Sequence, residues 1–308
     1  MIRYFPFTPT FEMKMGTVPM RESDYVVEAD DHYTSEIQLK RKLLTEDHAY
    51  YYQSLPEAKA AHWDVLEKVL EDLVISRPEL FSVEKTGDHW QITNHPLQET
   101  ASFVFGEDAS LPFEPLDWIG RQVQEDLIIL NPQGYITAGQ LCFPSGWSLG
   151  EKLGKQFMDV HAPLPPMAMP MLKAANTFME RIPVNKSFMR NNWGFRLGDQ
   201  LDLSSKYSDA YRQCLKDVLP KLDRESFGKK VFLRVEHQTL TRLKRSGDVL
   251  FTIHTYQHSL ESIVAHREQT MTLLSFLKGT PPELIDYKVM TPLMEPLLEY
   301  LSAKTLSR

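Results

Sequence analysis

One histidine of the sequence stands where its imidazole could be held toward a metal ion. His161 follows a short predicted helix and precedes the proline-rich run 162–166. Because proline fixes φ, this run is stiff and could present the imidazole from a rigid scaffold. Such an imidazole suits an axial bond to haem iron, which needs one nitrogen with a free lone pair. The alternative is a histidine that caps or packs against a loop, and the local sequence leaves both open.

Arg234 and Glu236 form a second candidate pair. Apolar and polar residues alternate with period two over residues 230–243, which predicts a strand with both side chains on one face. The strand is otherwise apolar enough to be buried, and an unpaired buried charge is costly. The two residues therefore either pair with each other to fix the sheet, or form a cation and a carboxylate that face a ligand pocket.

A third candidate is the sequence Arg190-Asn191-Asn192-Trp193. Its polar start predicts a loop, either an ordinary one or the rim of a pocket that could hold propionates. Arginine suits the second role, because its planar fork matches a carboxylate with two hydrogen bonds. His254 and His258 stand four residues apart, but a strand is predicted at His254 with His258 beyond it. Helical metal-ligand spacing therefore does not apply, and both are interpreted as structural or surface residues.

The elements that must position these residues follow from periodicity and turn signals. Residues 1–35 are expected to be irregular. Helices are predicted from after Pro56 to about Pro78 and over residues 116–130, 171–182, 260–278 and 292–303. A further short helix is predicted to begin at residues 148–151, which have the form of a capping box. Strands are predicted over 89–93, 135–143, 230–243 and 249–256. Strands do not alternate regularly with helices, which favours an α+β fold over a doubly wound sheet.

Composition excludes several classes of protein. The 308 residues carry 34 Lys and Arg against 41 Asp and Glu, a net charge of −7, which argues against binding to nucleic acid or to an anionic membrane. Two cysteines, Cys142 and Cys214, cannot build a disulfide framework or a cysteine-rich metal site. The start of the sequence lacks a secretory signal and no apolar run could span a bilayer, so a cytoplasmic protein is expected. Motifs of the Rossmann, P-loop, zinc-protease and nucleophile-elbow types do not occur in the sequence.

Several motifs together resemble one family, over roughly residues 25–275. They include Cys142-Phe143-Pro144-Ser145-Gly146-Trp147, the sequence around His161, Arg190-Asn191-Asn192-Trp193 and the strand that contains Arg234-Val235-Glu236. In this order they resemble the haem-dependent oxidative N-demethylase family. The resemblance implies a PAS-like antiparallel sheet core with added N- and C-terminal helices. It also implies one domain over residues 1–308, with its core at about 90–258, that buries haem b.

The activity implied by the resemblance is oxygen-dependent oxidative N-demethylation of a small secondary amine such as dimethylamine, with release of formaldehyde. No motif in this chain would bind a second redox cofactor, so electrons would come from another protein. The resemblance implies that this protein is a separate flavin or iron–sulfur reductase in partner subunits. A haem-binding sensor or carrier without turnover is the alternative, since fold does not fix function. A haem-free scaffold is a third hypothesis.

The resemblance also implies roles for individual residues. His161 would be the axial ligand of the iron, and Arg234 would lie over the distal face of the haem to orient oxygen or substrate. Glu236 would pair with a substrate ammonium or hold Arg234. Arg190, Asn191, Trp193 and Trp147 would contact the cofactor. The chain departs from the family at His237, where arginine is usual, and at Lys244, where proline is common.

Overall fold

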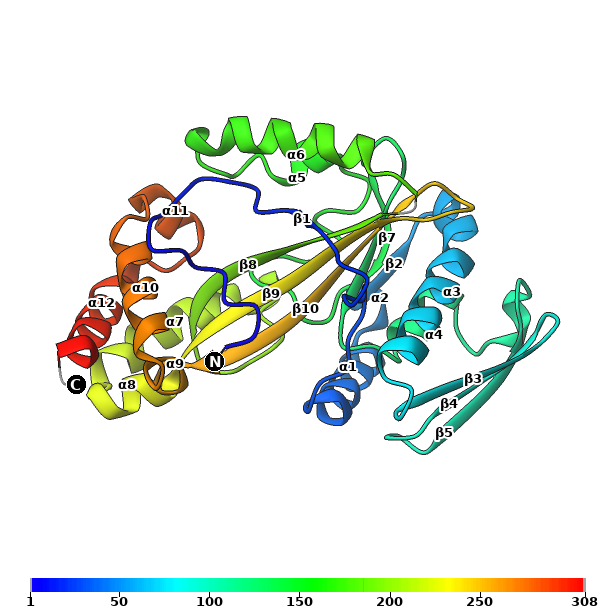
Figure 1. The fold of residues 1–308 in the computed structure, drawn as a ribbon, viewed down its shortest axis with the longest axis horizontal. Coiled ribbons are helices and arrows are strands. Elements are labelled where there is room, and N and C mark those ends of the chain that lie inside the picture. Colours follow the sequence, from blue (N-terminus) through cyan, green and yellow to red (C-terminus); the bar gives the residue numbers. More distant parts are fainter. Residues whose placement is uncertain (1, 185, 307–308) are drawn as a thin grey trace.

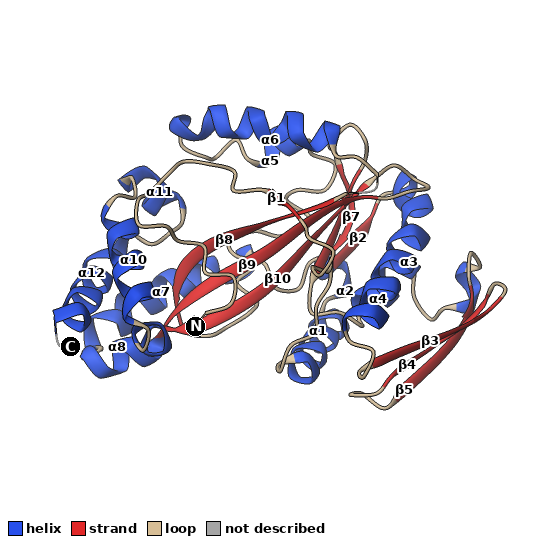
Figure 2. Cartoon of the chain, in the orientation of Figure 1, coloured by secondary structure: helices blue, strands red, loops and turns tan. Residues whose placement is uncertain are grey.

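A large antiparallel sheet forms the centre of the computed structural model, which describes residues 2–184 and 186–306 (Figures 1 and 2). Its strands are, in spatial order, β1 (Val18–Pro19), β8 (Ser187–Leu197), β9 (Val231–Arg242), β10 (Val249–Ser259), β6 (Asp126–Leu130), β7 (Ile136–Gln140) and β2 (Tyr52–Ser54). A separate three-stranded sheet contains β3 (Phe81–Thr86), β4 (His89–Asn94) and β5 (Glu99–Val104). The α+β class is confirmed, whereas the PAS-like relationship stays a prediction.

The hairpin of β9 and β10 is confirmed, and its alternation defines the two faces of the large sheet. Leu233, Val235 and His237 point to one face, which we call the lower face, together with Tyr256 of β10. Arg234 and Glu236 point to the opposite face, which we call the upper face. Side chains alternate along β9 with period two, as the sequence predicts, and those on the lower face are buried.

Two groups of helices cover the lower face. At one end α1 (Tyr33–Glu46) and α3 (Lys59–Ser76) share an apolar core with residues of β6 and β10. At the other end, helices from the C-terminal part of the chain pack on β8 and β9. These are α7 (Ser208–Val218), α8 (Arg224–Lys230), α9 (Leu260–Val264), α10 (Arg267–Lys278), α11 (Pro282–Tyr287) and α12 (Thr291–Leu306). No described helix combines the length and the apolar character that would let it cross a bilayer.

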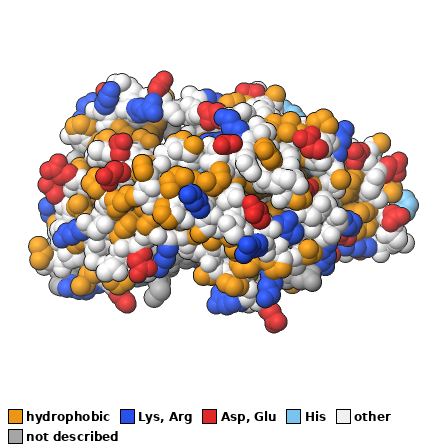
Figure 3. Space-filling view, turned by 90° about the horizontal axis from the view of Figure 1, so that it is seen from above, with side chains coloured by type: hydrophobic (Ala, Val, Ile, Leu, Met, Phe, Trp, Pro, Cys, Tyr) orange, Lys and Arg blue, Asp and Glu red, His pale blue; other side chains and the backbone are white. Residues whose placement is uncertain are grey.

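A lighter layer lies over the upper face. It consists of α5 (Phe157–Val160) and α6 (Met169–Arg181), which run above the sheet in Figure 1. Met179 and Ile182 pack there on Leu240 and Ile253 of the sheet. Along β8 the upper-face residues Phe188, Arg190 and Asn192 are only half-buried. The view from above in Figure 3 shows both charge signs interspersed with apolar side chains.

The helix predicted over residues 116–130 is wrong in its second half. Only α4 (Pro115–Gly120) is helical, and β6 follows it as a strand that is buried throughout. A strand buried on both faces has a continuous apolar run, and here its residues happened to continue a helical spacing. The apolar residues at 119, 123, 127 and 130 therefore gave a false helical signal.

Other predictions need smaller corrections. Glu151 accepts a hydrogen bond from the backbone N–H of Ser148 at 3.0 Å, as in a capping box, but a turn follows instead of a helix. The helix predicted over residues 260–278 is divided into α9 and α10. His258 lies inside β10 and not beyond it, and His254 is fully buried. Helices α1, α2 (His48–Tyr51), α7, α8 and α11 were not predicted.

Candidate functional site

The middle of the upper face carries a polar strip built by neighbouring strands. Arg190 and Asn192 of β8 lie opposite Gln238 and Glu236 of β9 in the register of the two strands. Arg190 Nη1 donates to Gln238 Oε1 at 3.2 Å, and Asn192 Nδ2 donates to Glu236 Oε2 at 3.1 Å. Gln238 Nε2 donates to the same Glu236 oxygen at 3.1 Å. Residues 190–193 are thus the centre of a strand, and the predicted loop is wrong.

Arg234 is the most deeply buried member of this strip, with 2% of its surface exposed. Its guanidinium donates to the carbonyl oxygens of Leu201, at 3.0 Å, and of Phe143. Its Nε has no hydrogen-bond partner in the described part of the chain and faces Glu236 Oε1 at 3.6 Å. Burial lowers the pKa of Arg234, while Glu236 acts to raise it. Arg234 therefore ties two loops to the sheet and turns one N–H toward Glu236.

A buried carboxylate fixes one of these loops. Asp126 accepts the backbone N–H groups of Cys142 at 2.7 Å and of Phe143 at 2.9 Å. Burial raises the pKa of Asp126 to about 6, although the nearby Lys40 acts to lower it. By holding Phe143 in place, Asp126 also holds the carbonyl group that binds Arg234.

Two further cations border the strip, and neither was predicted. Arg196 Nη2 donates to Ser145 Oγ at 3.0 Å, and its Nη1 donates to the carbonyl oxygen of Lys288 at 3.0 Å. Lys288 Nζ donates to Asn192 Oδ1 at 3.0 Å and to the carbonyl oxygen of Trp193 at 2.7 Å. Arg196 could have been found by extending the period-two alternation of Arg190 along β8, but nothing near Lys288 in the sequence points to this contact.

His161 stands directly after α5, in the layer above the upper face. Its Nδ1 lies 2.9 Å from the carbonyl oxygen of Phe157, and because a carbonyl only accepts, Nδ1 must carry the proton. Nε2 is then the nitrogen with the free lone pair. Burial lowers the pKa of His161, and the charge of Arg190 acts in the same direction. The ring is therefore neutral near pH 7 and has one nitrogen ready to bind a metal ion.

The other predicted contact residues divide between the two faces. Trp147 packs against the apolar cluster of the upper face, which includes Leu240 and Ile253. Asn191 lies on the lower face, where its Oδ1 is 2.8 Å from His237 Nδ1. Trp193 is also on the lower face, packed against Phe7 and Phe276. The structure thus brings His161, Arg190, Arg234, Glu236 and Trp147 to one face and does not bring Asn191 and Trp193 there.

The donor set of the upper face fits haem better than a free metal ion. Within residues 2–184 and 186–306, no three His, Cys, Asp or Glu side chains gather as a metal site. A haem iron takes four nitrogens from its own ring and needs only one or two protein ligands. A neutral imidazole whose Nδ1–H donates to a backbone carbonyl is the usual state of a metal-binding histidine. Two surface hollows lie elsewhere. One of about 790 Å³ is lined by residues of α7, α11 and α12, and one of about 320 Å³ lies on the three-stranded sheet.

Fold and site together define an α+β protein in which a neutral, oriented histidine lies above a cation-rich sheet face, which is an arrangement suited to haem. Residues 18–298 match the family model described as haem-dependent oxidative N-demethylase, alpha subunit-like. The match covers most of the chain, so the protein belongs to this family. The family is named for haem dependence and oxidative N-demethylation.

Proposed function

We propose that this protein binds haem b through His161 and carries out oxygen-dependent oxidative N-demethylation of a small secondary amine such as dimethylamine. The observation that carries the proposal is the hydrogen bond from His161 Nδ1 to the carbonyl oxygen of Phe157. This bond leaves Nε2 unprotonated, and an axial ligand of haem iron requires such a nitrogen. Membership of the family supports the same reading.

When bound, the haem would supply binding and activation of oxygen, while the chain would supply orientation and charge. Arg190 is half-buried and close enough to His161 to lower its pKa, so it is the first candidate to bind a haem propionate. Trp147 and its apolar neighbours would cover part of the porphyrin and exclude water. Asn191 and Trp193 take no part in this proposal, because their side chains lie on the lower face.

Glu236 is the group we propose for the amine. It is a carboxylate with a side chain only 12% exposed, and Arg234, Asn192 and Gln238 all direct donors toward it. A substrate ammonium would add a charge-assisted hydrogen bond to this carboxylate. Arg234 would act as a positioning residue, since two of its donor nitrogens already bond carbonyl oxygens of the chain.

The reaction requires a source of electrons outside this chain. One atom of oxygen is transferred to the methyl carbon and leaves with it as formaldehyde, while the C–N bond breaks and nitrogen takes up a proton. The other oxygen atom is reduced to water. The balance for each turnover is two electrons and two protons, which we propose come from a flavin or iron–sulfur reductase. The words "alpha subunit-like" in the family's description support such partner subunits.

The test begins with the absorbance spectrum of the protein expressed with ample haem. We expect a Soret band in the wild type and in the exposed-histidine control His89→Ala. His161→Ala should retain the fold by circular dichroism but bind haem more weakly by at least the ~10–100-fold typical of a lost metal-supporting contact. A His161→Ala variant with an unchanged spectrum would refute the ligand assignment.

Turnover is tested separately on the haem-loaded protein. With dimethylamine, oxygen and a chemical or protein reductant, we expect formaldehyde and a primary amine in equal amounts. Spectral changes on adding ligands, without formaldehyde from any small methylamine, would instead identify a sensor or carrier. A colourless wild-type protein would refute haem binding altogether.

A further inference from the structure

Three cations on the upper face and its border form no ion pair among the residues that the structure describes. These are Arg190, Arg196 and Lys288, all half-buried. Their donors bond neutral oxygens instead. These are the backbone carbonyl oxygens of Met15, Phe195, Lys288 and Trp193 and the side-chain oxygens of Gln238, Ser145 and Asn192. The carboxylate whose charge acts on all three is Glu236, which also faces Arg234. The strip therefore has more positive than negative charge.

This imbalance is unfavourable in the protein alone. Burial lowers the pKa of Arg190 and that of Arg196. It also lowers the pKa of Lys288 to about 7; Glu236 opposes this shift, and the two arginines add to it. Cations that are removed from water and repel one another are stabilised when an anion joins them. A bound anion would thus supply the missing negative charge.

The backbone is shaped to bring these cations together. Gly194 has no side chain, and the guanidinium of Arg196 occupies the space, so that a Cβ at this position would lie 3.3 Å from Arg196 Nη1. After Lys288 the chain turns sharply, with Val289 at φ +56°. A β-branched residue seldom adopts this conformation, and such strain is concentrated at functional sites. The first feature leaves room for Arg196 over β8, and the second directly follows Lys288, whose Nζ donates to Asn192.

We propose that Arg190, Arg196 and Lys288 form a binding site for a carboxylate beside Glu236. Guanidinium groups bind carboxylates with paired hydrogen bonds, and the lysine adds a mobile point charge. The carboxylate has two possible sources, a propionate of haem or an N-methylated amino acid. In the second case the inference rests on the proposed function, because Glu236 would bind the ammonium of the same zwitterion.

The experiment compares ligands with and without a free carboxylate. Haem and haem dimethyl ester are titrated into the haem-free protein, and N-methylglycine and dimethylamine into the haem-loaded protein. If the source is a propionate, the wild type prefers haem to its ester by about tenfold or more, and Arg196→Gln and Lys288→Met reduce that preference. If the source is a substrate, the wild type prefers N-methylglycine to dimethylamine by about tenfold, and the same variants remove that preference instead.

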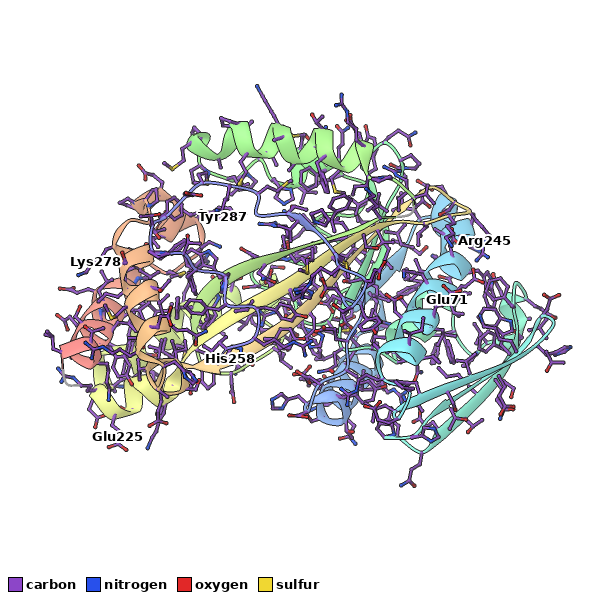
Figure 4. All side chains as sticks on the ribbon, in the orientation of Figure 1. Glu71, Glu225, Arg245, His258, Lys278 and Tyr287 are labelled. Atoms are coloured by element: carbon purple, nitrogen blue, oxygen red, sulfur yellow. The ribbon has the colours of Figure 1, made fainter. Side chains whose placement is uncertain are left out.

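Matched controls keep the result specific to the site. Arg212→Gln removes an exposed arginine of α7, and Lys278→Met removes an exposed lysine of α10 that is labelled in Figure 4. Both controls should retain the wild-type preferences. Should Arg196→Gln fail to fold, Lys288→Met at the edge of the sheet carries the same comparison.

The proposal is overturned if the wild type shows neither preference, or if both variants keep the wild-type ratios. Failure of the proposed function gives a different result. A wild type that binds no haem would refute that function. In that case, calorimetric titration of N-methylglycine into the haem-free protein tests the carboxylate site independently of haem. Binding that Arg196→Gln and Lys288→Met both weaken supports the site, and absence of such binding refutes it.

Discussion

On the lower face of the sheet, His254 lies between two carboxylates, with Nδ1 2.8 Å from Glu125 and Nε2 3.7 Å from Asp30. On the upper face, Arg190, Arg196 and Lys288 have neutral oxygens as their hydrogen-bond partners. Both groups of charges lie on or beside central strands of the large sheet, His254 on β10 and the two arginines on β8. They differ in whether the described chain itself supplies the opposite charge.

The lower-face charges continue into a network that fixes the N-terminal segment. Glu28 accepts hydrogen bonds from Arg3 and Tyr4, both at 2.6 Å, and from the hydroxyl of Tyr256. The backbone N–H of Glu28 donates to Glu125 Oε1 at 2.7 Å. These bonds connect residues far apart in the sequence, so the lower network stabilises the fold.

The contrast separates a structural role from a binding role for buried charge. A charge that pairs within the protein holds elements together, whereas we infer that the upper-face cations, left with neutral partners, are available to a ligand. Removal of a charge should therefore reduce stability on the lower face and binding on the upper face. The predictions below test this separation.

The largest effect is expected for His254→Leu. The substitution leaves Glu125 as a buried carboxylate without its cation, and breaking a buried pair in this way costs about 3–5 kcal/mol. Denaturant unfolding measures the loss. His258→Leu is the control on the same strand and face, because burial lowers the pKa of His258 and its Nε2 has no hydrogen-bond partner in the described chain. Equal losses in the two variants would show that the ion pair contributes nothing.

A second prediction concerns the pH dependence of the free energy of unfolding. Burial acts to lower the pKa of His254, but Glu125 and Asp30 raise it to about 10. Since this pKa is above the unfolded value of about 6.5, the stabilisation is complete below pH 6.5 and is lost as pH rises toward 10. Lys288 works in the opposite direction, because its pKa is lowered to about 7 and its destabilising charge disappears over the same range.

Variants isolate the two contributions. Between pH 7 and 10 the free energy of unfolding should fall less with pH in His254→Leu than in the wild type, and more in Lys288→Met. Denaturant titrations at four pH values give these slopes. Parallel curves for all three proteins would mean that neither group titrates differently in the folded and unfolded states, and the comparison of the two faces would lose its basis.

The sequence predicted those parts of the fold whose signal is local. The hairpin of β9 and β10 was found because apolar and polar residues alternate over its whole length. The sequence predicts a helix at β6 because both faces of this strand are buried, which removes the alternation. The sequence predicts a loop at residues 190–193 of β8 because the upper-face side chains there are polar and belong to the site instead of an apolar core.

The candidate site shows the same limit. His161, Arg190, Arg234 and Glu236 were recognised from motifs, and the structure brings them to one face. Lys288 is 52 residues beyond Glu236 in the sequence, and no motif connects it to the polar strip. Contacts of this kind follow from how helices pack against the sheet edge, which a single sequence does not encode in a local pattern.

The smallest change in stability is expected for Gly194→Ala, which tests whether the upper face is adapted to binding. The added methyl group would lie 3.3 Å from Arg196 Nη1, the end of a flexible side chain that can move aside. Alanine also restricts the unfolded chain, so stability should be unchanged or higher by up to about 1 kcal/mol. The displaced guanidinium should nevertheless weaken the carboxylate preference, measured with the same four ligands.

Gly139→Ala is the matched control on β7 of the same sheet. There a Cβ would lie 3.0 Å from the backbone carbonyl oxygen of Leu127, which cannot move without shifting the strand. Overpacking of this kind costs about 1–3 kcal/mol. If Gly194→Ala were as destabilising as Gly139→Ala, Arg196 would be a fixed structural group, and the upper face would resemble the lower one. Stability retained together with weaker carboxylate binding would instead show that the glycine is there to make room for the cation.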